Sequence, residues 1–265
     1  MPSTTRKVDY DQIAHLYDEP GRDFEPDPDL LRFLKRRARS DPSSLRVLDM
    51  GCGTGKQLAA DHARLPGLRL AGLDFFHGML EQARKRCAAI DWVQADSTHP
   101  PFPDASFDYV TNQFSYPHIS DKVQLIRETY RILKPGGQFA ITNIDPWSMP
   151  GWVLYRFFPA ALARDLADFL SEDQLVSMLT QAGFLNIQVR RQINRTEERL
   201  GDFLAYASER HRTSHFIAID DQAYQDGLAA ITESIRRSGP DARLPSELCL
   251  IWFLADKPGS GPAAG

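Results

Sequence analysis

Residues 46–56 read Arg-Val-Leu-Asp-Met-Gly-Cys-Gly-Thr-Gly-Lys, and this stretch decides the fold. Val47 and Leu48 favour a buried strand, and three glycines at alternate positions remove the side chains that would keep a ligand away from the main chain. Residues 57–65 have a helical composition, so the first N–H groups of that helix would point into the space that the glycines open. The pattern therefore predicts a strand, a nucleotide-type binding turn and a helix.

This stretch resembles the first motif of the class I S-adenosylmethionine-dependent methyltransferases, in which two hydrophobic residues precede Asp-x-Gly-x-Gly-x-Gly. Within that class, the chain looks like the small-molecule methyltransferases of type 11, also called UbiE-like. The nearest alternative is the Gly-x-Gly-x-x-Gly fingerprint of NAD-binding folds, but its third glycine would fall on Lys56. The resemblance implies that S-adenosylmethionine is the cofactor and that it binds at this turn.

Two acidic residues follow predicted strands. Residues 68–74 read as a second buried strand that ends at Asp74, and a carboxylate there can accept two hydrogen bonds from a ribose diol. A third strand, residues 90–95, is followed by Asp96, and the resemblance implies that this acid accepts the amine of adenine, which is only a donor. The residues predicted to bind the cofactor are Tyr17, Gly51, Cys52, Gly53, Gly55, Asp74, Phe75, Met79, Asp96, Ser97 and Gln113.

Phe75 and Met79 have two interpretations. Both could pack against one face of adenine, because they follow the second strand closely. Alternatively, both could simply belong to the core.

Residues 100–110 resemble a phrase of the same family, Leu/Phe-Pro-x-x-x-Phe-Asp-x-Val, whose last part is the fourth strand. NAD-binding domains do not carry this phrase. In an open parallel sheet, ligands bind beyond the carboxyl ends of the strands, so the loop at residues 111–121 should border the transferred methyl group. His118 in this loop is the candidate catalytic base, and a structural loop histidine is the alternative.

The resemblance extends from Val47 to Asn143 and implies an α/β fold: a Rossmann-like, doubly wound, seven-stranded and mostly parallel sheet with an antiparallel last strand. A helix at residues 122–133 should end in a turn at 133–137, before a fifth strand at 138–144. Alternating or apolar patterns place the late strands at 184–191 and 248–255. The predicted domains are an N-terminal helical lid at 1–40, the cofactor-binding core at 41–195 and 244–256, a helical insert at 196–243 that caps the substrate site, and a disordered tail at 257–265.

The N-terminal segment resembles a family element, Tyr-Asp-x-x-Ala-x-x-Tyr-Asp, that closes over the cofactor. Tyr10-Asp11, Ala14 and Tyr17-Asp18 match it, and an amphipathic helix docked on the core is the alternative. Asp27 and Pro28 predict the cap and first residue of a second helix, which should end near Ser40.

Residues 145–159 are rich in large apolar side chains. We interpret them as a wall or lid of the substrate pocket, with ordinary core packing as the alternative.

Composition limits the class of partner. The chain has 265 residues, a net charge of -4 and three widely separated cysteines, which disfavours nucleic acid, a disulfide framework and a zinc site. We expect no metal, because no further acidic cluster accompanies the cofactor acids. No signal sequence or membrane-spanning run is visible, so we expect a cytoplasmic protein without stable membrane insertion. The sequence leaves homodimer formation open.

The resemblance implies methyl transfer from S-adenosylmethionine to an O, N or C nucleophile of a small, hydrophobic or aromatic molecule. The reaction would be an in-line displacement, in which the protein positions the two reactants and excludes water. Two alternatives stay open at this point. One is a cofactor-binding scaffold or regulatory subunit without catalysis. The other, which matches the motifs less well, is an NAD-dependent oxidoreductase.

Overall fold

The computed structural model describes residues 8–17, 24–37 and 41–259. Residues 1–7 of the predicted lid, Asp18 of the N-terminal element, Ser40, and residues 260–265 of the tail predicted to be disordered at 257–265 lie outside the described residues. Contacts divide the chain into two compact units, which are described separately. The larger unit comprises residues 10–143, 172–190 and 252–265, and the smaller unit comprises 1–9, 144–171 and 191–251.

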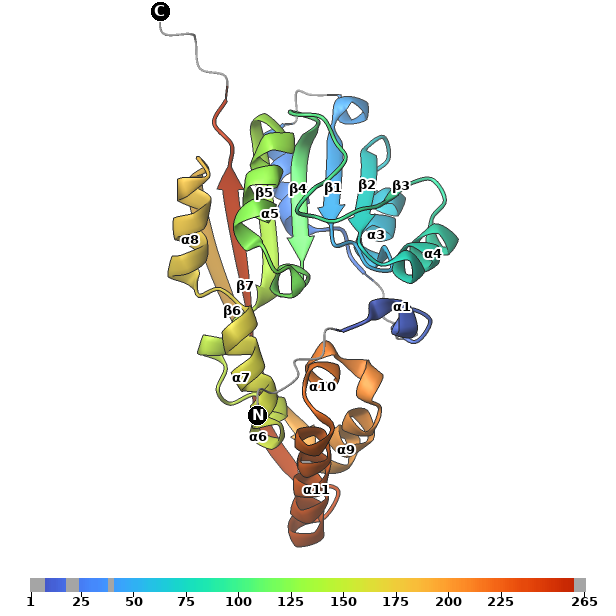
Figure 1. The fold of residues 1–265 in the computed structure, drawn as a ribbon, viewed down its shortest axis with the longest axis vertical. Helices are drawn as coiled ribbons and strands as arrows, with labels where there is room; N and C mark the ends of the chain where they lie inside the picture. Colours follow the sequence, from blue (N-terminus) through green and yellow to red (C-terminus); the bar gives the residue numbers. More distant parts are fainter. Residues whose placement is uncertain (1–7, 18–23, 38–40, 260–265) are drawn as a thin grey trace, which may run out of the picture. The chain divides into compact units, whose positions relative to one another are not determined.

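A seven-stranded sheet organises the larger unit. Its strands are β1 (Arg46–Met50), β2 (Arg69–Asp74), β3 (Asp91–Gln94), β4 (Phe107–Gln113), β5 (Leu133–Ile144), β6 (Leu185–Arg199) and β7 (Arg243–Asp256). They lie in the order β3-β2-β1-β4-β5-β7-β6 (Figure 1). Six strands are parallel and β7 is antiparallel, which confirms the predicted Rossmann-like sheet. The order reverses between β1 and β4, so the carboxyl ends of these two strands border the point where such sheets bind ligands.

Helices cover both faces of this sheet. The helices of the larger unit are α1 (Tyr10–Ile13), α2 (Pro28–Arg36), α3 (Lys56–Arg64), α4 (His77–Arg86), α5 (Lys122–Ile132) and α8 (Glu172–Gln181), with short 3-10 turns η1 (Pro42–Ser44) and η2 (Tyr116–His118). Leu30, Leu58 and Leu80, from α2, α3 and α4, share one buried cluster with strand residues. Figure 1 shows α5 on the opposite face. Because helices cover both faces, β1 is buried from Val47 to Met50 and β4 from Phe107 to Asn112, polar residues included.

The start of α2 confirms the sequence prediction. Asp27 is the N-cap, its side chain accepts a hydrogen bond from the Asp29 amide, and Pro28 is the first helical residue. The helix ends at Arg36.

The segment at residues 133–137, predicted as a turn before the fifth strand, lies inside β5, which begins at Leu133. Its register with β4 is irregular there: Leu133 pairs with Phe107, pairing resumes at Gln138 with Tyr109, and Gly136 has a φ of +74°. The helix before it does end as expected, at Ile132. The Gly136 N–H donates to the carbonyl groups of Lys257 and Pro258, at 3.0 and 3.1 Å, and the Lys257 N–H donates to the Gly137 carbonyl. Hydrogen bonds to the distant C-terminal chain therefore fix this irregular segment in place.

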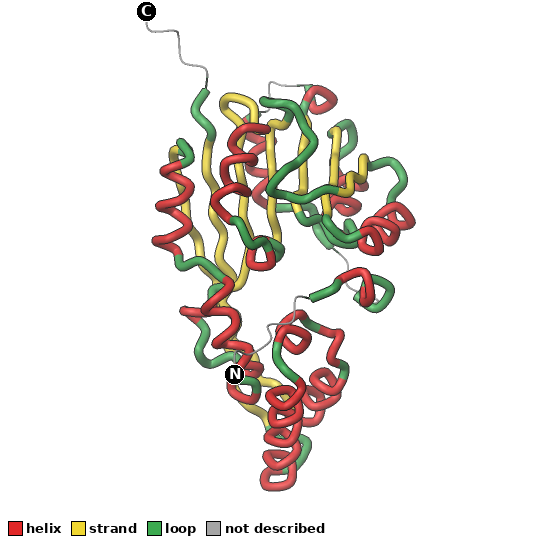
Figure 2. Tube along the Cα trace, viewed as in Figure 1, coloured by secondary structure: helices red, strands yellow, loops and turns green. Residues whose placement is uncertain are grey.

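The smaller unit is mainly helical (Figure 2). Its elements, besides the remaining parts of β6 and β7, are η3 (Pro146–Ser148), α6 (Val153–Phe157), α7 (Pro159–Asp168), α9 (Leu200–Ser208), η4 (Arg210–Arg212), α10 (Ser214–Ala218) and α11 (Asp221–Ser238). Residues 144–171, which the sequence analysis grouped with the core, belong to this unit together with the insert. None of the helices in the described ranges is both long enough and apolar enough to cross a membrane.

The apolar segment at 145–159 forms part of the core of the smaller unit. Met149, Leu154 and Phe158 are almost fully buried there, whereas Trp147 is 44% exposed. A Cβ atom on Gly227 would lie 2.2 Å from the Phe158 ring, so only glycine lets α11 approach this closely. Core packing, the alternative considered from the sequence, therefore accounts for most of this segment.

Candidate functional site

The glycine-rich turn follows β1 and leads into α3. The amides of Gly51 and Cys52 both donate to the Leu73 carbonyl, at 2.7 and 3.0 Å, which fixes the turn against the end of β2. Gly51, Gly53 and Gly55 all have positive φ angles, of 81°, 52° and 73°. Residues with a Cβ atom rarely adopt this conformation, so the backbone itself requires the three glycines.

The three glycines differ in how much room a side chain would have beside them, which the sequence could not show. A Cβ on Gly51 would lie 2.2 Å from the Ser115 Oγ, and a Cβ on Gly55 would lie 2.4 Å from the Trp92 ring. A Cβ on Gly53 would meet nothing within 4 Å. The expectation that all three open space for a ligand is therefore corrected: Gly51 and Gly55 allow close packing of protein, and Gly53 faces open space.

Asp74 closes the turn from the end of β2. Its Oδ2 accepts from the Gly53 amide at 2.8 Å, and its Oδ1 accepts from the Phe76 amide at 2.9 Å. Burial raises the pKa of this carboxyl, and the two amide donors oppose that rise. Each oxygen retains acceptor capacity, so the carboxylate can bind the two hydroxyls of a ribose.

Asp49 is the last but one residue of β1 and is 4% exposed. Its Oδ1 is fully buried and has no hydrogen-bond partner among the described residues. Burial first, and then the negative charges of Asp61, Asp27 and Asp74, raise the pKa of this carboxyl well above its ordinary value. A buried acceptor without a donor costs about 1–3 kcal/mol. A cationic donor carried by a ligand would remove this cost, so the site fits the methionine end of the predicted cofactor.

Two further buried acids, Asp27 and Asp61, lie close to Asp49. The Asp27 amide donates to the Asp61 Oδ1 at 2.8 Å, and the Asp27 Oδ2 accepts from the Tyr109 hydroxyl at 3.2 Å. Gln113, a predicted cofactor ligand, directs its Nε2 to the same Asp27 oxygen at 3.5 Å. Within the described ranges, no group of three or more His, Cys, Asp or Glu side chains is arranged to hold a metal ion. Asp27, Asp49 and Asp61 therefore form a group of carboxyls beside the turn whose pKa values burial raises.

This cluster gives a prediction on stability. Burial raises the Asp61 pKa to about 7. In the unfolded chain the same carboxyl ionises near its ordinary value of 3.8. Because the folded state holds the proton more tightly, its stability falls as pH rises from about 4 to about 7 and is lowest above that range. Asp61→Asn removes this loss of stability, because asparagine does not ionise. The side-chain oxygen of the asparagine can still accept the hydrogen bond from the Asp27 backbone amide. We expect it to raise the unfolding free energy at pH 8 by about 2–4 kcal/mol and to change it little at pH 4.5.

Thermal unfolding at the two pH values measures this difference. Asp91→Asn, an exposed acid on β3, is the matched control and should show no such pH-dependent gain. Equal stability of the wild type and Asp61→Asn at pH 8 would show that Asp61 ionises without cost in the folded protein.

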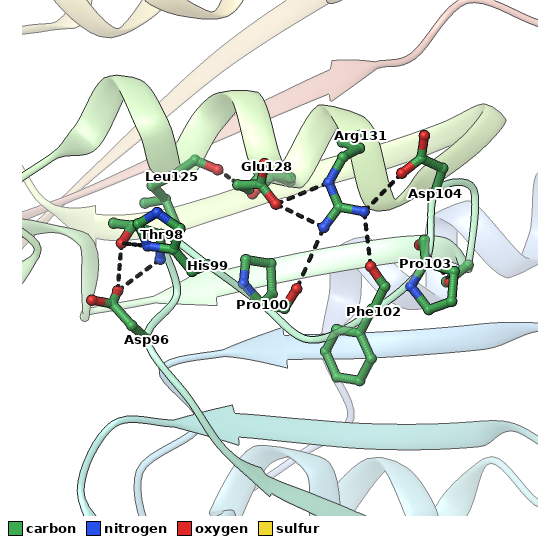
Figure 3. Close-up of polar contacts among 12 residues, drawn as sticks. Asp96, Thr98, His99, Pro100, Phe102, Pro103, Asp104, Leu125, Glu128 and Arg131 are labelled. Atoms are coloured by element: carbon green, nitrogen blue, oxygen red, sulfur yellow. Dashed lines mark hydrogen bonds and ion pairs between the residues drawn. The ribbon is translucent and has the colours of Figure 1, made fainter.

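Asp96 and Ser97 follow β3 in a tight turn. The Asp96 Oδ1 accepts from both the amide and the hydroxyl of Thr98, at 2.8 and 2.7 Å (Figure 3). These bonds fix the carboxylate, and its Oδ2 makes no hydrogen bond to any other described residue, so it can accept the amine of adenine. Asp96 is exposed and Ser97 is buried.

Phe75 and Met79, the two predicted partners of the adenine face, lie in different environments. Phe75 is 62% exposed and is therefore available to stack on a ring. Met79 is 2% exposed, so core packing accounts for it.

The N-terminal element packs on the start of α4. Its helix, α1, spans only Tyr10–Ile13, which is shorter than the predicted element. The Asp11 Oδ1 accepts from the Gly78 amide at 2.6 Å, and Ala14 is buried. The Tyr10 ring makes edge contacts with Phe76 and Tyr17, with centroids 5.2 and 5.8 Å apart. The element therefore docks on the larger unit, and Tyr17 itself remains exposed.

His118 ends the 3-10 turn η2 and contacts Tyr10. The Tyr10 hydroxyl lies 3.1 Å from the His118 Nε2, and the two rings meet edge to face at 5.6 Å. The sequence pattern places Tyr10 in the N-terminal element but predicts neither Tyr10 nor Phe76 as a site residue. The Tyr10-Asp11 pair of the matched element was the available signal for Tyr10. A neutral imidazole held at one nitrogen can accept a proton at the other, which suits it to the role of base.

Comparisons with known proteins agree with this geometry. A family model described as a methyltransferase domain matches residues 48–141. The ubiquinone/menaquinone biosynthesis C-methyltransferase UbiE of Desulfotalea psychrophila is 29% identical over 207 residues, which cover 69% of this chain and 83% of that protein. The demethylmenaquinone methyltransferase of Listeria monocytogenes is 33% identical over 164 residues, which cover 52% of this chain and 69% of that protein.

A similarity to a solved structure concerns the fold. Phosphoethanolamine N-methyltransferase 2 of Haemonchus contortus, solved in complex with S-adenosyl-L-methionine, superposes with a TM-score of 0.59 at 24% sequence identity. The match covers 94% of this chain and 57% of that one, so this chain spans less than two thirds of that protein.

Proposed function

Because the chain belongs to the class I S-adenosylmethionine-dependent methyltransferases, we propose that it methylates a small apolar molecule by in-line displacement at the sulfonium methyl. One observation carries this proposal. Gly53, beside which the main chain is open, donates its amide hydrogen bond to the buried Asp74 carboxylate at 2.8 Å. A turn with open space beside an acid at the end of β2 suits an adenosyl group.

We assign the contacts to the donor as follows. Asp74 accepts from the ribose hydroxyls, the Oδ2 of Asp96 accepts from the adenine amine, and the buried Oδ1 of Asp49 accepts from the ammonium of the methionine part. Phe75, exposed at the end of β2, stacks on the adenine face. When bound, S-adenosylmethionine supplies a methyl group that is already activated by the sulfonium charge, so the chain's own task is to bind, orient and exclude water.

We further assign His118 as the base. This role requires the tautomer in which the Nε2–H donates to the Tyr10 oxygen, 3.1 Å away, because Nδ1 then takes the proton that the substrate loses. Tyr10 positions the imidazole and fixes its tautomer. Such a base is needed when the nucleophile is a hydroxyl or a ring carbon next to one.

The first acceptor to test is a quinol. Two relatives carry the names demethylmenaquinone methyltransferase and ubiquinone/menaquinone biosynthesis C-methyltransferase, and a quinol ring is both apolar and planar. Removing a proton from a ring hydroxyl makes the adjacent ring carbon nucleophilic. This is the step that a positioned base accelerates.

The experiment incubates the purified protein with S-adenosylmethionine carrying an isotope-labelled methyl group and a short-chain demethylmenaquinol. We expect mass spectrometry to find the labelled methyl group in the quinol. Unlabelled S-adenosylhomocysteine should form in an amount equal to that of the methylated quinol. Donor binding without consumption, with this quinol and a panel of phenols and amines, would support the scaffold alternative instead.

A further inference from the structure

Phe114 stands directly after β4 and combines two unfavourable features. Its φ angle is +55°, in the left-handed region that residues with a Cβ atom rarely adopt. Its side chain is 49% exposed, although it is a large apolar ring. Only two other described residues besides glycine, Ala105 and Asn186, have a positive φ. Neither of these carries a large apolar side chain, so Phe114 is the unusual member of this set.

The residues on both sides of Phe114 impose its conformation. The Asn112 Nδ2 donates to the Met50 carbonyl at 2.7 Å, and its Oδ1 accepts from the Tyr116 amide at 2.9 Å. The Ser115 hydroxyl donates to the same Met50 carbonyl at 3.1 Å. The Phe114 amide itself donates to the Thr142 carbonyl at 2.9 Å. Strained backbone persists only where surrounding contacts determine it in this way, and such positions cluster at functional sites.

The segment that carries Phe114 packs against the glycine-rich turn. Its neighbour Ser115 lies so close to Gly51 that a Cβ on that glycine would overlap the Ser115 Oγ. The same loop carries His118, four residues further on. The Phe114 ring thus belongs to the segment that joins the cofactor turn to the proposed base. Neither the donor contacts nor the base assigned above uses this ring.

We propose that Phe114 is a contact residue for the methyl acceptor, whose planar or apolar part packs against the Phe114 ring beside the cofactor turn. The inference rests on the proposed function and deepens it: the ring selects apolar acceptors over polar ones. Binding of such an acceptor covers the exposed ring, which accounts for an apolar side chain kept in water at a strained position.

The test separates strain from ligand contact. Phe114→Gly removes the ring and relieves the backbone, and Phe114→Asn removes the ring but also tolerates the left-handed region. Phe114→Tyr keeps an aromatic face. Ala105→Gly is the matched control, because it relieves the same strain in the turn before β4, away from the site. Calorimetry measures binding of 1,4-naphthoquinone, an isosteric quinone probe, to protein saturated with S-adenosylhomocysteine.

We expect the wild type and Ala105→Gly to bind the quinone equally, and Phe114→Gly and Phe114→Asn to bind it at least about 10-fold more weakly. Phe114→Tyr should stay within about 3-fold of wild type. S-adenosylhomocysteine affinity should be unchanged in all variants, and neither Phe114→Gly nor Ala105→Gly should lower the melting temperature.

Unchanged quinone binding in Phe114→Gly would overturn the proposal, and so would a parallel loss of S-adenosylhomocysteine affinity, which would make Phe114 part of the cofactor site. A wild type that does not bind the quinone would also overturn it for this acceptor class. By contrast, a wild type that binds the quinone but transfers no label to the quinol contradicts the proposed function and leaves the contact assigned to Phe114 standing.

Discussion

Asp74→Ala is expected to weaken S-adenosylhomocysteine binding by about 100-fold. The carboxylate is buried and fixed by the amides of Gly53 and Phe76, so it needs no reorganisation to accept two ribose hydroxyls. Two charge-assisted hydrogen bonds together contribute about 3 kcal/mol, which corresponds to this factor. Isothermal titration calorimetry measures the dissociation constant.

The fold should survive this substitution. Asp74→Ala leaves two amides without their partner, but it also removes a carboxylate whose pKa burial raises, so the two effects partly offset each other. Asp91→Ala, at the exposed start of β3, is the control and should bind like wild type. Donor affinity of the wild type should also fall in acid, because protonation of Asp74 removes an acceptor. Wild-type affinity in the Asp74→Ala variant would contradict the ribose assignment.

The parts of the fold that local sequence determines were predictable. The strand, turn and helix at residues 46–64 follow from Val47, Leu48 and the glycines, which have positive φ in the structure. The start of α2 follows from Asp27 and Pro28, because a cap and a fixed φ angle act within one turn of helix. The seven-stranded, mostly parallel sheet with its antiparallel last strand was expected from resemblance to a family, and the order of its strands is seen only in the structure, since no local pattern encodes which strands become neighbours.

The parts that long-range contacts determine were not predictable. The segment at 133–137 reads as a turn, yet it pairs with Lys257 and Pro258, more than 100 residues away. The Gly51 and Gly55 positions read as ligand space, yet they are filled by Ser115 and Trp92. Local pattern cannot identify the side chain that occupies such a space, because that side chain comes from a distant part of the chain.

The same limit applies to the candidate site. The acids and the glycine turn lie on consecutive strand ends, so their order in the sequence already places them together. The contact between Tyr10 and His118 joins residues 108 positions apart, and only the folded chain reveals it. The left-handed conformation of Phe114 depends on hydrogen bonds made by Asn112 and Ser115 and is equally invisible in the sequence.

His118→Ala is expected to lower kcat for the quinol by about 10²–10⁴-fold, because it removes the group that takes the acceptor's proton. Donor affinity should not change, since no donor contact is assigned to this side chain. Tyr10→Phe should lower kcat by about 10-fold, because the imidazole then loses the hydroxyl that orients it at 3.1 Å. Single-turnover kinetics with labelled donor measure the chemical step, and calorimetry measures donor affinity separately.

The pair of substitutions tests whether the two residues act as one unit. If Tyr10 acts only through His118, the Tyr10→Phe/His118→Ala double variant should be no slower than His118→Ala alone, because the base that Tyr10 positions is already absent. His62→Ala, an exposed histidine on α3, should keep wild-type turnover and serves as the control. Full turnover in His118→Ala would remove the base from the mechanism. Multiplicative losses in the double variant would instead give Tyr10 a role of its own against the acceptor, independent of the imidazole.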